Sequence, residues 1–143
     1  MDNSRCIHRV QYYETDRMAI VHHSNYIRWM EEARLDFMRN NGADCVDIEY
    51  RGVQIPVVSI DCRYKNSARF GDVAETEVRL TFFNGIRMCF SYRSFLQGTD
   101  IVLTEGTSEH CFIDENTHRP VNLRRRLPDV CDAITKILKE TDN

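Results

Sequence analysis

The sequence predicts an α+β protein in which an antiparallel sheet curves around one long helix. Apolar residues recur at spacings of three and four between Tyr26 and Phe37, which is the repeat of a helix with one buried face. From Ile60 onward, apolar residues alternate with polar ones, which is the repeat of half-buried strands. Turn signals at Asn84-Gly85 and at residues 98–100 separate the alternating segments, so neighbouring strands are expected to form hairpins.

The length and composition fit a soluble protein of one domain. A chain of 143 residues suits a single domain, expected here to span residues 1–143. Hydrophobic residues make up 42% and charged residues 29%, an ordinary globular balance. No apolar run approaches the roughly 20 residues that span a bilayer. The formal net charge of −3 argues against a nucleic-acid partner, which usually requires a basic surface.

The N-terminus indicates the cytoplasm, and that location in turn sets what is expected of the cysteines. Residues 1–5 lack the apolar core of an export signal, so a cytoplasmic location is expected. The six cysteines are scattered and never form a C-x-x-C pair, which argues against a zinc knuckle or a redox pair. We expect reduced thiols that pack as small apolar side chains.

The first predicted elements lie between residues 6 and 42. Residues 6–13 alternate loosely between apolar and polar side chains and are expected to form a strand, followed by an irregular stretch over residues 14–23. Ser24 or Asn25 is expected to cap the long helix, because a short polar side chain can accept from the free amides of the first turn. Gly42 is expected to end it, since glycine adopts the left-handed conformation common at helix ends.

Four long strands and a short helix are predicted after the long helix. Three strands alternate around residues 60–65, 75–82 and 87–93, and the fourth spans residues 102–113. Asn84-Gly85 suits a two-residue primed turn, in which both central residues have positive φ. Residues 127–138 are expected to form a final helix with Pro128 in its first turn. Such a sheet has unpaired edges, so we expect a homodimer or a homotetramer.

The stretch from Tyr12 to Tyr26 concentrates reactive side chains. It holds two carboxylates, two imidazoles and three phenols, just before and at the start of the long helix. A helix N-terminus presents free N–H groups and partial positive charge, which suit a carbonyl oxygen that gains negative charge during attack. A carboxylate beside it can act as a general base on water or as a nucleophile on an acyl carbon.

The same stretch resembles the signature of a known enzyme family. The 4-hydroxybenzoyl-CoA thioesterase family of hot-dog folds is similar to the pattern Thr15-Asp16-x-x-Ala19-Ile20-Val21-x-x-x-Asn25-Tyr26-x-Arg28-Trp29-Met30. Tyr12, Asp16 and His23 also resemble the arrangement of acyl-CoA thioesterases linked to the bacterial Tol-Pal envelope system. The resemblance covers most of the chain. It implies a hot-dog fold, a curved antiparallel sheet wrapped around one long central helix.

The resemblance also implies roles for particular residues. Asp16 matches the catalytic carboxylate, and the backbone amide of His23 matches the group that polarises the thioester carbonyl. Tyr12 matches a tyrosine that shapes or orients the site. The positions expected to contact the substrate are Ala19, Tyr26 and Arg69.

Residue 19 is where the sequence departs from the family. The family often has glycine where this chain has Ala19, and glycine permits a positive φ that alanine resists. Either the loop needs no such conformation, or its geometry differs slightly in this chain. Two neighbours, Glu14 and His22, are given no role in the site, and Glu14 is expected to be solvated.

The function that the resemblance implies is hydrolysis of acyl-CoA thioesters to a free acid and coenzyme A. Asp16 would act as general base or as nucleophile, without a metal or a redox cofactor, and coenzyme A would enter as part of the substrate. An acyl carrier protein thioester is the alternative substrate. Two other functions stay open: a hot-dog dehydratase acting on hydroxyacyl thioesters, and a non-catalytic acyl-CoA-binding module.

Overall fold

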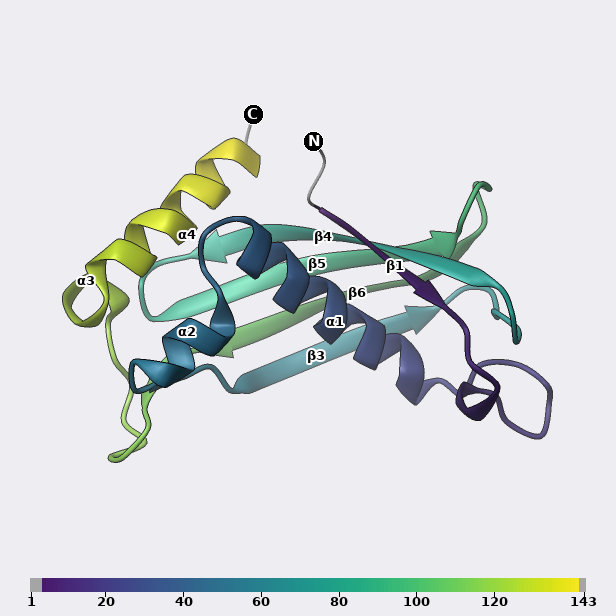
Figure 1. The fold of residues 1–143 in the computed structure, drawn as a ribbon, viewed down its shortest axis with the longest axis horizontal. Coiled ribbons are helices and arrows are strands. Elements are labelled where there is room, and N and C mark those ends of the chain that lie inside the picture. The colour runs from purple at the N-terminus through teal and green to yellow at the C-terminus, as the bar shows by residue number, and fades with distance from the viewer. Residues whose placement is uncertain (1–3, 142–143) are drawn as a thin grey trace.

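The structure, a computed structural model, describes residues 4–141 and contains a five-stranded sheet with a long helix across one face. The strands are β1 (Arg5–Arg9), β4 (Val73–Phe83), β5 (Arg87–Leu96), β6 (Val102–Cys111) and β3 (Val57–Tyr64), in that order across the sheet, and all neighbours are antiparallel. Helix α1 (Ser24–Asn40) lies along the sheet (Figure 1). Residues 1–3 and 142–143 of the expected domain lie outside the described residues, as does most of the N-terminus considered for an export signal.

The main core forms between α1 and the sheet, as the two sequence periods predict. Met30, Ala33 and Phe37 of α1 are buried and join an apolar cluster with Val78, Leu80, Met88 and Phe90 of the sheet. Burying a large apolar side chain contributes about 1.5–3 kcal/mol. Gly42 follows the end of α1 with φ 86°, which confirms the predicted stop. The predicted α+β fold, a sheet around one long helix, is confirmed.

Smaller elements gather at the end of the molecule away from the start of α1 (Figure 1). They are α2 (Cys45–Tyr50), α3 (Leu123–Arg126) and α4 (Pro128–Thr141). The last confirms the predicted final helix, and Pro128 is its first residue. The other two are too short to produce a helical repeat in the sequence, so they were not predicted. β2 (Val53–Gln54) and β7 (Ile113–Asp114) pair as a separate small sheet.

Two predicted strands are shorter in the structure. β1 ends four residues early, and residues 12–14 form a 3-10 turn. The Glu14 carboxylate closes that turn by accepting the Gln11 N–H at 2.8 Å. The last predicted strand is interrupted at Phe112, whose ring is fully buried and whose N–H donates to the Ile86 carbonyl outside the ladder. Burial of one side chain thus redirects the backbone.

The β4–β5 turn also differs from its prediction. The connection spans three residues, Asn84–Ile86, and only Gly85 has a positive φ, at 92°. Asn84 Oδ1 accepts the backbone N–H groups of Ile86 and Arg87, at 2.9 and 2.8 Å. This side-chain turn replaces the second left-handed residue of a primed turn, so the predicted turn type is wrong.

Two further expectations concern membrane-spanning segments and the packing of the cysteines. Within residues 4–141, no helix combines the length and the apolar composition needed to cross a membrane. All six cysteines are free thiols. Cys45 and Cys131 are buried in the main core, and the other four are half-buried. Cys45 and Cys131 therefore pack as small apolar side chains, whereas the Cys6 thiol donates to the Asp36 carboxylate at 3.4 Å.

Candidate active site

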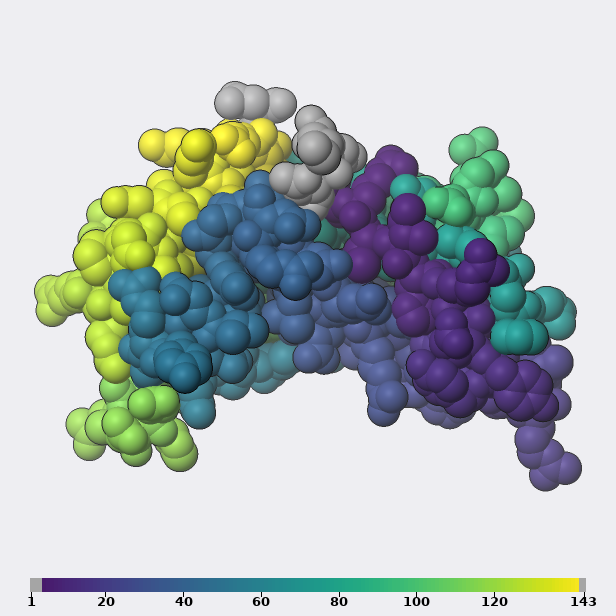
Figure 2. All heavy atoms as spheres, in the orientation of Figure 1, coloured from purple at the N-terminus to yellow at the C-terminus, as the bar shows by residue number. Residues whose placement is uncertain are grey.

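The segment between β1 and α1 forms one end of the molecule (Figure 1) and stands out from the surface at the lower right of Figure 2. Thr15 and Val21 form an isolated antiparallel bridge, which closes a loop over residues 15–21. Inside the loop, the Asp16 N–H donates to the Ile20 carbonyl at 2.9 Å. The Ala19 N–H donates to the Asp16 carbonyl, also at 2.9 Å. The loop is therefore short and internally hydrogen-bonded.

A second small core holds this loop against the rest of the fold. Its buried members are Val10, Val21, Tyr26, Trp29, Ala68, Ala74 and Leu103. The Val21 N–H donates to the Ala68 carbonyl at 2.9 Å, and the Ala68 N–H donates to the Tyr26 hydroxyl at 3.0 Å. Burial raises the pKa of Tyr26. Tyr26 was expected to contact the substrate, and in the structure its hydroxyl links α1 to the segment before β4.

The Asp16 carboxylate lies half-buried on the loop. Its Oδ1 accepts the Met18 N–H at 2.8 Å, which fixes the orientation of the side chain. No donor from the described part of the chain reaches Oδ2. One oxygen is thus held by the loop, and the other has room to accept a proton or to attack a carbon.

The residue before the start of α1 supplies an unpaired donor at the end of this loop. His23 is the N-cap residue, and among residues 4–141 its backbone N–H has no acceptor. The predicted caps are wrong, because Ser24 is already the first helical residue and the Asn25 amide donates instead to the Glu14 carbonyl at 2.9 Å. The Ser24 N–H donates to Nδ1 of the His22 imidazole at 3.3 Å. The His23 N–H is therefore free to meet a carbonyl oxygen.

Two other expected site residues lie on the surface beside the loop. The Tyr12 side chain is 76% exposed and meets the Phe70 ring edge-on, with centroids 5.7 Å apart. Arg69 is exposed, and its backbone N–H donates to Asp72 at 2.8 Å. The Tyr12–Phe70 contact thus brings the Tyr12 and Arg69 segments together. Their roles toward a substrate stay predictions.

Ala19 adopts the left-handed conformation, with φ 63°. The loop therefore does need a positive φ at the position where the family often has glycine. Alanine accepts the strain because the hydrogen bond from its N–H to Asp16 and the Thr15–Val21 bridge close the loop on both sides.

Glu14 and Tyr64 belong to the site region although the sequence assigned neither to it. Glu14 was expected to be solvated, but it is only 4% exposed. Burial alone would raise its pKa, yet hydrogen bonds from His8, Gln11 and Trp29 hold that pKa below its ordinary value. The Tyr64 hydroxyl donates to the His23 carbonyl at 3.2 Å. Partial burial, followed by the Cys62 thiol, raises the pKa of Tyr64 to about 12.

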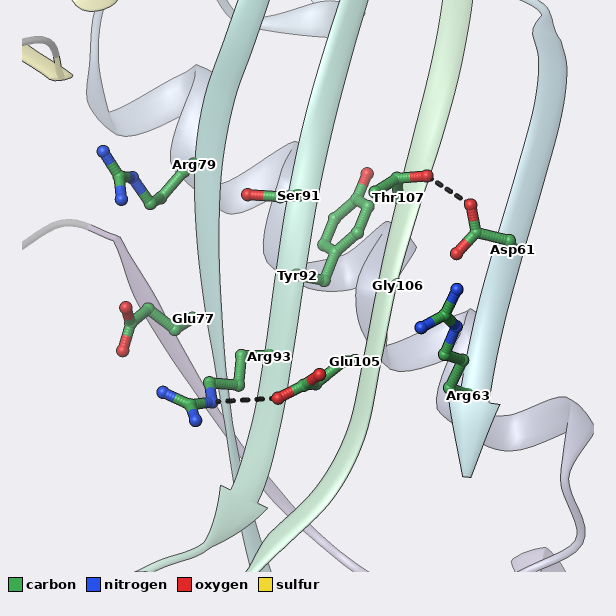
Figure 3. A pocket seen from close by; sticks show the side chains of 10 residues that line it. All are labelled: Asp61, Arg63, Glu77, Arg79, Ser91, Tyr92, Arg93, Glu105, Gly106 and Thr107. Atoms are coloured by element: carbon green, nitrogen blue, oxygen red, sulfur yellow. Dashed lines mark hydrogen bonds and ion pairs between the residues drawn. The ribbon is translucent and has the colours of Figure 1, made fainter. Parts of the chain in front are cut away.

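A groove crosses the opposite face of the sheet, away from α1 (Figure 3). One row of paired residues across the strands carries its charges, in the order Glu77, Arg93, Glu105 and Arg63. The next row adds Arg79 at one side and Asp61 at the other. Acidic and basic side chains balance, so the groove has no net positive charge to attract the phosphates of a coenzyme. We therefore do not assign the active site to it.

The structure gives limited information on metal and cofactor binding. Among residues 4–141, no group of three or more His, Cys, Asp or Glu side chains lies close enough to hold a metal ion. The rings of His22 and His23 are in contact, with centroids 4.2 Å apart and planes tilted by 31°. The expectation of no metal and no redox cofactor stays a prediction.

Residues 10–134 match the family described as the thioesterase-like superfamily. A protein of Bacillus subtilis, named putative acyl-CoA thioesterase YneP, is 32% identical over 130 residues, which cover 91% of this chain and 94% of that protein. Acyl-CoA thioester hydrolase YbgC of Escherichia coli is 27% identical over 85 residues, 59% of this chain and 63% of its own length.

The fold also has close counterparts among solved structures. The structure of a DHNA-CoA thioesterase from Staphylococcus aureus superposes with a TM-score of 0.91 at 29% identity, covering 97% of this chain and 93% of that one. Agreement over this share of both chains confirms the hot-dog architecture expected from the sequence.

Proposed function

The chain belongs to the thioesterase-like superfamily, and from that premise we propose that it hydrolyses acyl-CoA thioesters to a free acid and coenzyme A. One observation carries the proposal. A closed loop that leads into the start of α1 carries the Asp16 carboxylate, and within residues 4–141 neither Oδ2 of Asp16 nor the His23 N–H has a partner. Water activation and carbonyl polarisation need a base and a donor of these two kinds. The relatives named as acyl-CoA thioesterases support the same reaction.

In the proposed reaction, the thioester carbonyl oxygen accepts the His23 N–H. Asp16 takes a proton from water as the water oxygen bonds to the carbonyl carbon, and negative charge on the carbonyl oxygen is stabilised at the helix N-terminus. The C–S bond then breaks, and the proton passes from Asp16 to the departing thiolate. No metal or redox cofactor takes part.

Direct attack by Asp16 is the alternative route. The carboxylate oxygen would bond to the acyl carbon as the thiolate leaves, and water would then hydrolyse the mixed anhydride. A single turnover in ¹⁸O-labelled water tests the anhydride route, because label in Asp16 arises only from that intermediate, whereas label in the acid alone is also produced when water attacks the acyl carbon of the anhydride. Water that attacks the Asp16 carbonyl of an anhydride leaves ¹⁸O in the Asp16 peptide, which mass spectrometry detects, whereas the general-base route places all the label in the acid product.

Substitution of Asp16 tests the function. Asp16→Asn removes the base and the nucleophile, so kcat/KM for thiol release should fall by about 100-fold or more. Asp100→Asn, an exposed aspartate in the β5–β6 turn, is the matched control and should retain full activity. Undiminished release by Asp16→Asn would contradict the mechanism. Tight acyl-CoA binding without release by the wild type would indicate a binding module.

The acyl group is best identified by a substrate panel. The panel includes aliphatic and aromatic acyl-CoA thioesters, a hydroxyacyl-CoA, and an acyl carrier protein thioester. DHNA-CoA belongs in it because a structural neighbour at 29% identity is named a DHNA-CoA thioesterase. Water loss from the hydroxyacyl-CoA without thiol release would indicate a dehydratase instead.

The active form is proposed to be at least a homodimer, joined through β3. This strand lies at the edge of the sheet, and one side of it has no neighbour within residues 4–141. Exposed edges usually pair or are covered. Tyr64, the last residue of β3, contacts His23 through its hydroxyl. A second copy paired at this edge would therefore lie beside the site and help to enclose the acyl group. A homotetramer would need a further interface.

A further inference from the structure

The Glu14 carboxylate joins three parts of the fold. Its Oε1 accepts the Gln11 N–H at 2.8 Å and lies 2.7 Å from Nε2 of His8 on β1. Its Oε2 accepts the indole N–H of Trp29 on α1 at 2.8 Å. With only 4% of the residue exposed, these protein groups replace the water that a carboxylate normally binds.

The main chain of Glu14 joins the two arms of the loop. Its carbonyl oxygen accepts the His22 N–H at 2.8 Å and the Asn25 side-chain amide at 2.9 Å. The next residue, Thr15, pairs with Val21 in the bridge that closes the loop. Glu14 therefore lies where the arm leading to Asp16 leaves the fold and where the arm leading to α1 returns.

From this arrangement we propose that Glu14 is a positioning residue for thioester hydrolysis. It holds the Asp16 carboxylate in a set position relative to the His23 N–H, and it does so through the loop without touching the substrate. The inference rests on the proposed function. A displacement of about 1 Å between groups that act together can cost about 100-fold in rate, so an anchor common to both is a determinant of kcat.

The ionised form of Glu14 is suited to this role. The Gln11 and Trp29 N–H groups are fixed donors, one to each carboxylate oxygen. A glutamine has one acceptor oxygen and one amide nitrogen, and that nitrogen would face one of the two donors. Glu14→Gln keeps the shape of the side chain but places a donor against a donor, so one anchor is lost.

The test measures steady-state hydrolysis of an acyl-CoA that the wild type turns over, at a temperature where circular dichroism shows each variant folded. Glu14→Gln should lower kcat about 10-fold or more with KM changed less than about threefold, because only the alignment of reacting groups is lost. Glu32→Gln is the matched control. Glu32 also contacts His8, at 3.4 Å from Nδ1, but its side chain is 49% exposed and makes no bond to the loop. It should keep the wild-type kcat.

A double variant separates positioning from a general structural effect. When Asp16→Asn has already removed the base, Glu14→Gln should lower the residual rate less than about twofold, because residues that act through one another are non-additive. An equal loss in both backgrounds would overturn the proposal, as would a folded Glu14→Gln with wild-type kcat.

Trp29→Phe is a second test of the positioning role of Glu14, for use if Glu14→Gln does not fold. It removes one donor from the carboxylate and leaves the other contacts. A several-fold loss of kcat that disappears in the Asp16→Asn background is expected, and an unchanged kcat would overturn the proposal. Absence of thiol release by the wild type with every thioester in the panel would instead be a failure of the proposed function, and the two failures are distinguishable.

Discussion

At residue 19 the backbone takes φ 63°, a conformation in which the Cβ of an L-residue approaches the following carbonyl oxygen. The cost is roughly 1–2 kcal/mol for a residue with a side chain. The loop holds Ala19 there because its N–H is bonded to Asp16 and because Thr15 pairs with Val21. Local strain is thus stored three residues from the proposed catalytic carboxylate.

Ala19→Gly should raise the free energy of unfolding by up to about 1 kcal/mol. Glycine removes the strain, and its greater freedom in the unfolded chain offsets part of the gain. Urea denaturation measures the change. Ala133→Gly, in the middle of α4, is the control and should have the opposite sign, a loss of about 0.5–1 kcal/mol. A lower free energy of unfolding for Ala19→Gly than for the wild type would contradict the proposed strain at residue 19.

His110 is a fully buried imidazole in the core. Its Nε2 lies 2.7 Å from Ser108 Oγ, which lies 2.6 Å from the Tyr92 hydroxyl. The Arg34 guanidinium donates to that hydroxyl at 3.2 Å. Within residues 4–141, Nδ1 of His110 has no partner. Burial, followed by the nearby Arg34 cation, lowers the pKa of His110 from 6.5 to about 4.

Stability should fall as the pH drops through the window between 6.5 and 4. There the unfolded chain binds a proton at residue 110 and the folded chain does not, so protonation favours unfolding. By pH 5 the loss should be about 2 kcal/mol relative to pH 7.5. Urea midpoints at pH 7.5, 6 and 5 test this. His110→Gln should flatten the dependence, whereas His118→Asn, at an exposed turn, should keep it.

Among the elements, α1, β6 and β3 meet tightly at Gly106 of β6. A Cβ built there would meet the main-chain carbonyl oxygen of Asp61 and would lie 2.8 Å from the Met30 methyl. The glycine therefore allows the helix, β6 and β3 to meet at one point. Strand alternation in the sequence does not reveal this, since the contact joins residues distant along the chain.

Gly106→Ala should lower the free energy of unfolding by about 1–3 kcal/mol, because one added methyl group must displace backbone and core together. Thermal or urea unfolding measures the loss. Ser91→Ala, on the outer face of the neighbouring strand β5, should stay within about 0.5 kcal/mol of the wild type. If Gly106→Ala and the wild type have the same free energy of unfolding, the prediction is contradicted, because β6 can then accommodate the methyl group by shifting.

For the whole molecule, the sheet edge at β3 is the feature with the widest consequence. Val57, Val58, Ile60 and Tyr64 are all exposed along this strand. An uncovered edge with apolar side chains favours pairing with another chain. Because β3 ends at the residue that contacts His23, assembly and activity are expected to be linked.

Ile60→Asp should shift the protein from dimer to monomer in sedimentation velocity and lower thiol release in parallel. The charge would lie at an edge that a second copy covers, where its desolvation is costly. Ile101→Asp is the control. Its side chain is 46% exposed in the β5–β6 turn, outside β3, so the substitution should leave the sedimenting mass of the protein unchanged. A wild type that sediments as a monomer would contradict the proposed assembly.

The features of this protein that can be predicted from the sequence arise from short-range repeats and one local signature. The spacing of Tyr26 to Phe37 predicted α1 and its buried face, because the helical repeat is a property of neighbouring residues. The strict alternation of the later segments predicted the sheet for the same reason. The Tyr12 to Tyr26 stretch indicated the family and Asp16, since a loop and the helix start after it are contiguous in the chain.

Contacts between residues that are distant in the sequence depend on the folded chain. Glu14 became a buried anchor because β1 and α1 bring His8 and Trp29 to it, and no repeat in the sequence encodes that meeting. The Tyr64–His23 contact depends in the same way on how β3 lies against α1. The left-handed turn at Ala19 depends on loop closure, which overrides the preference of alanine. Local preferences cost about 1–2 kcal/mol to override, and a packed, hydrogen-bonded core supplies more than that.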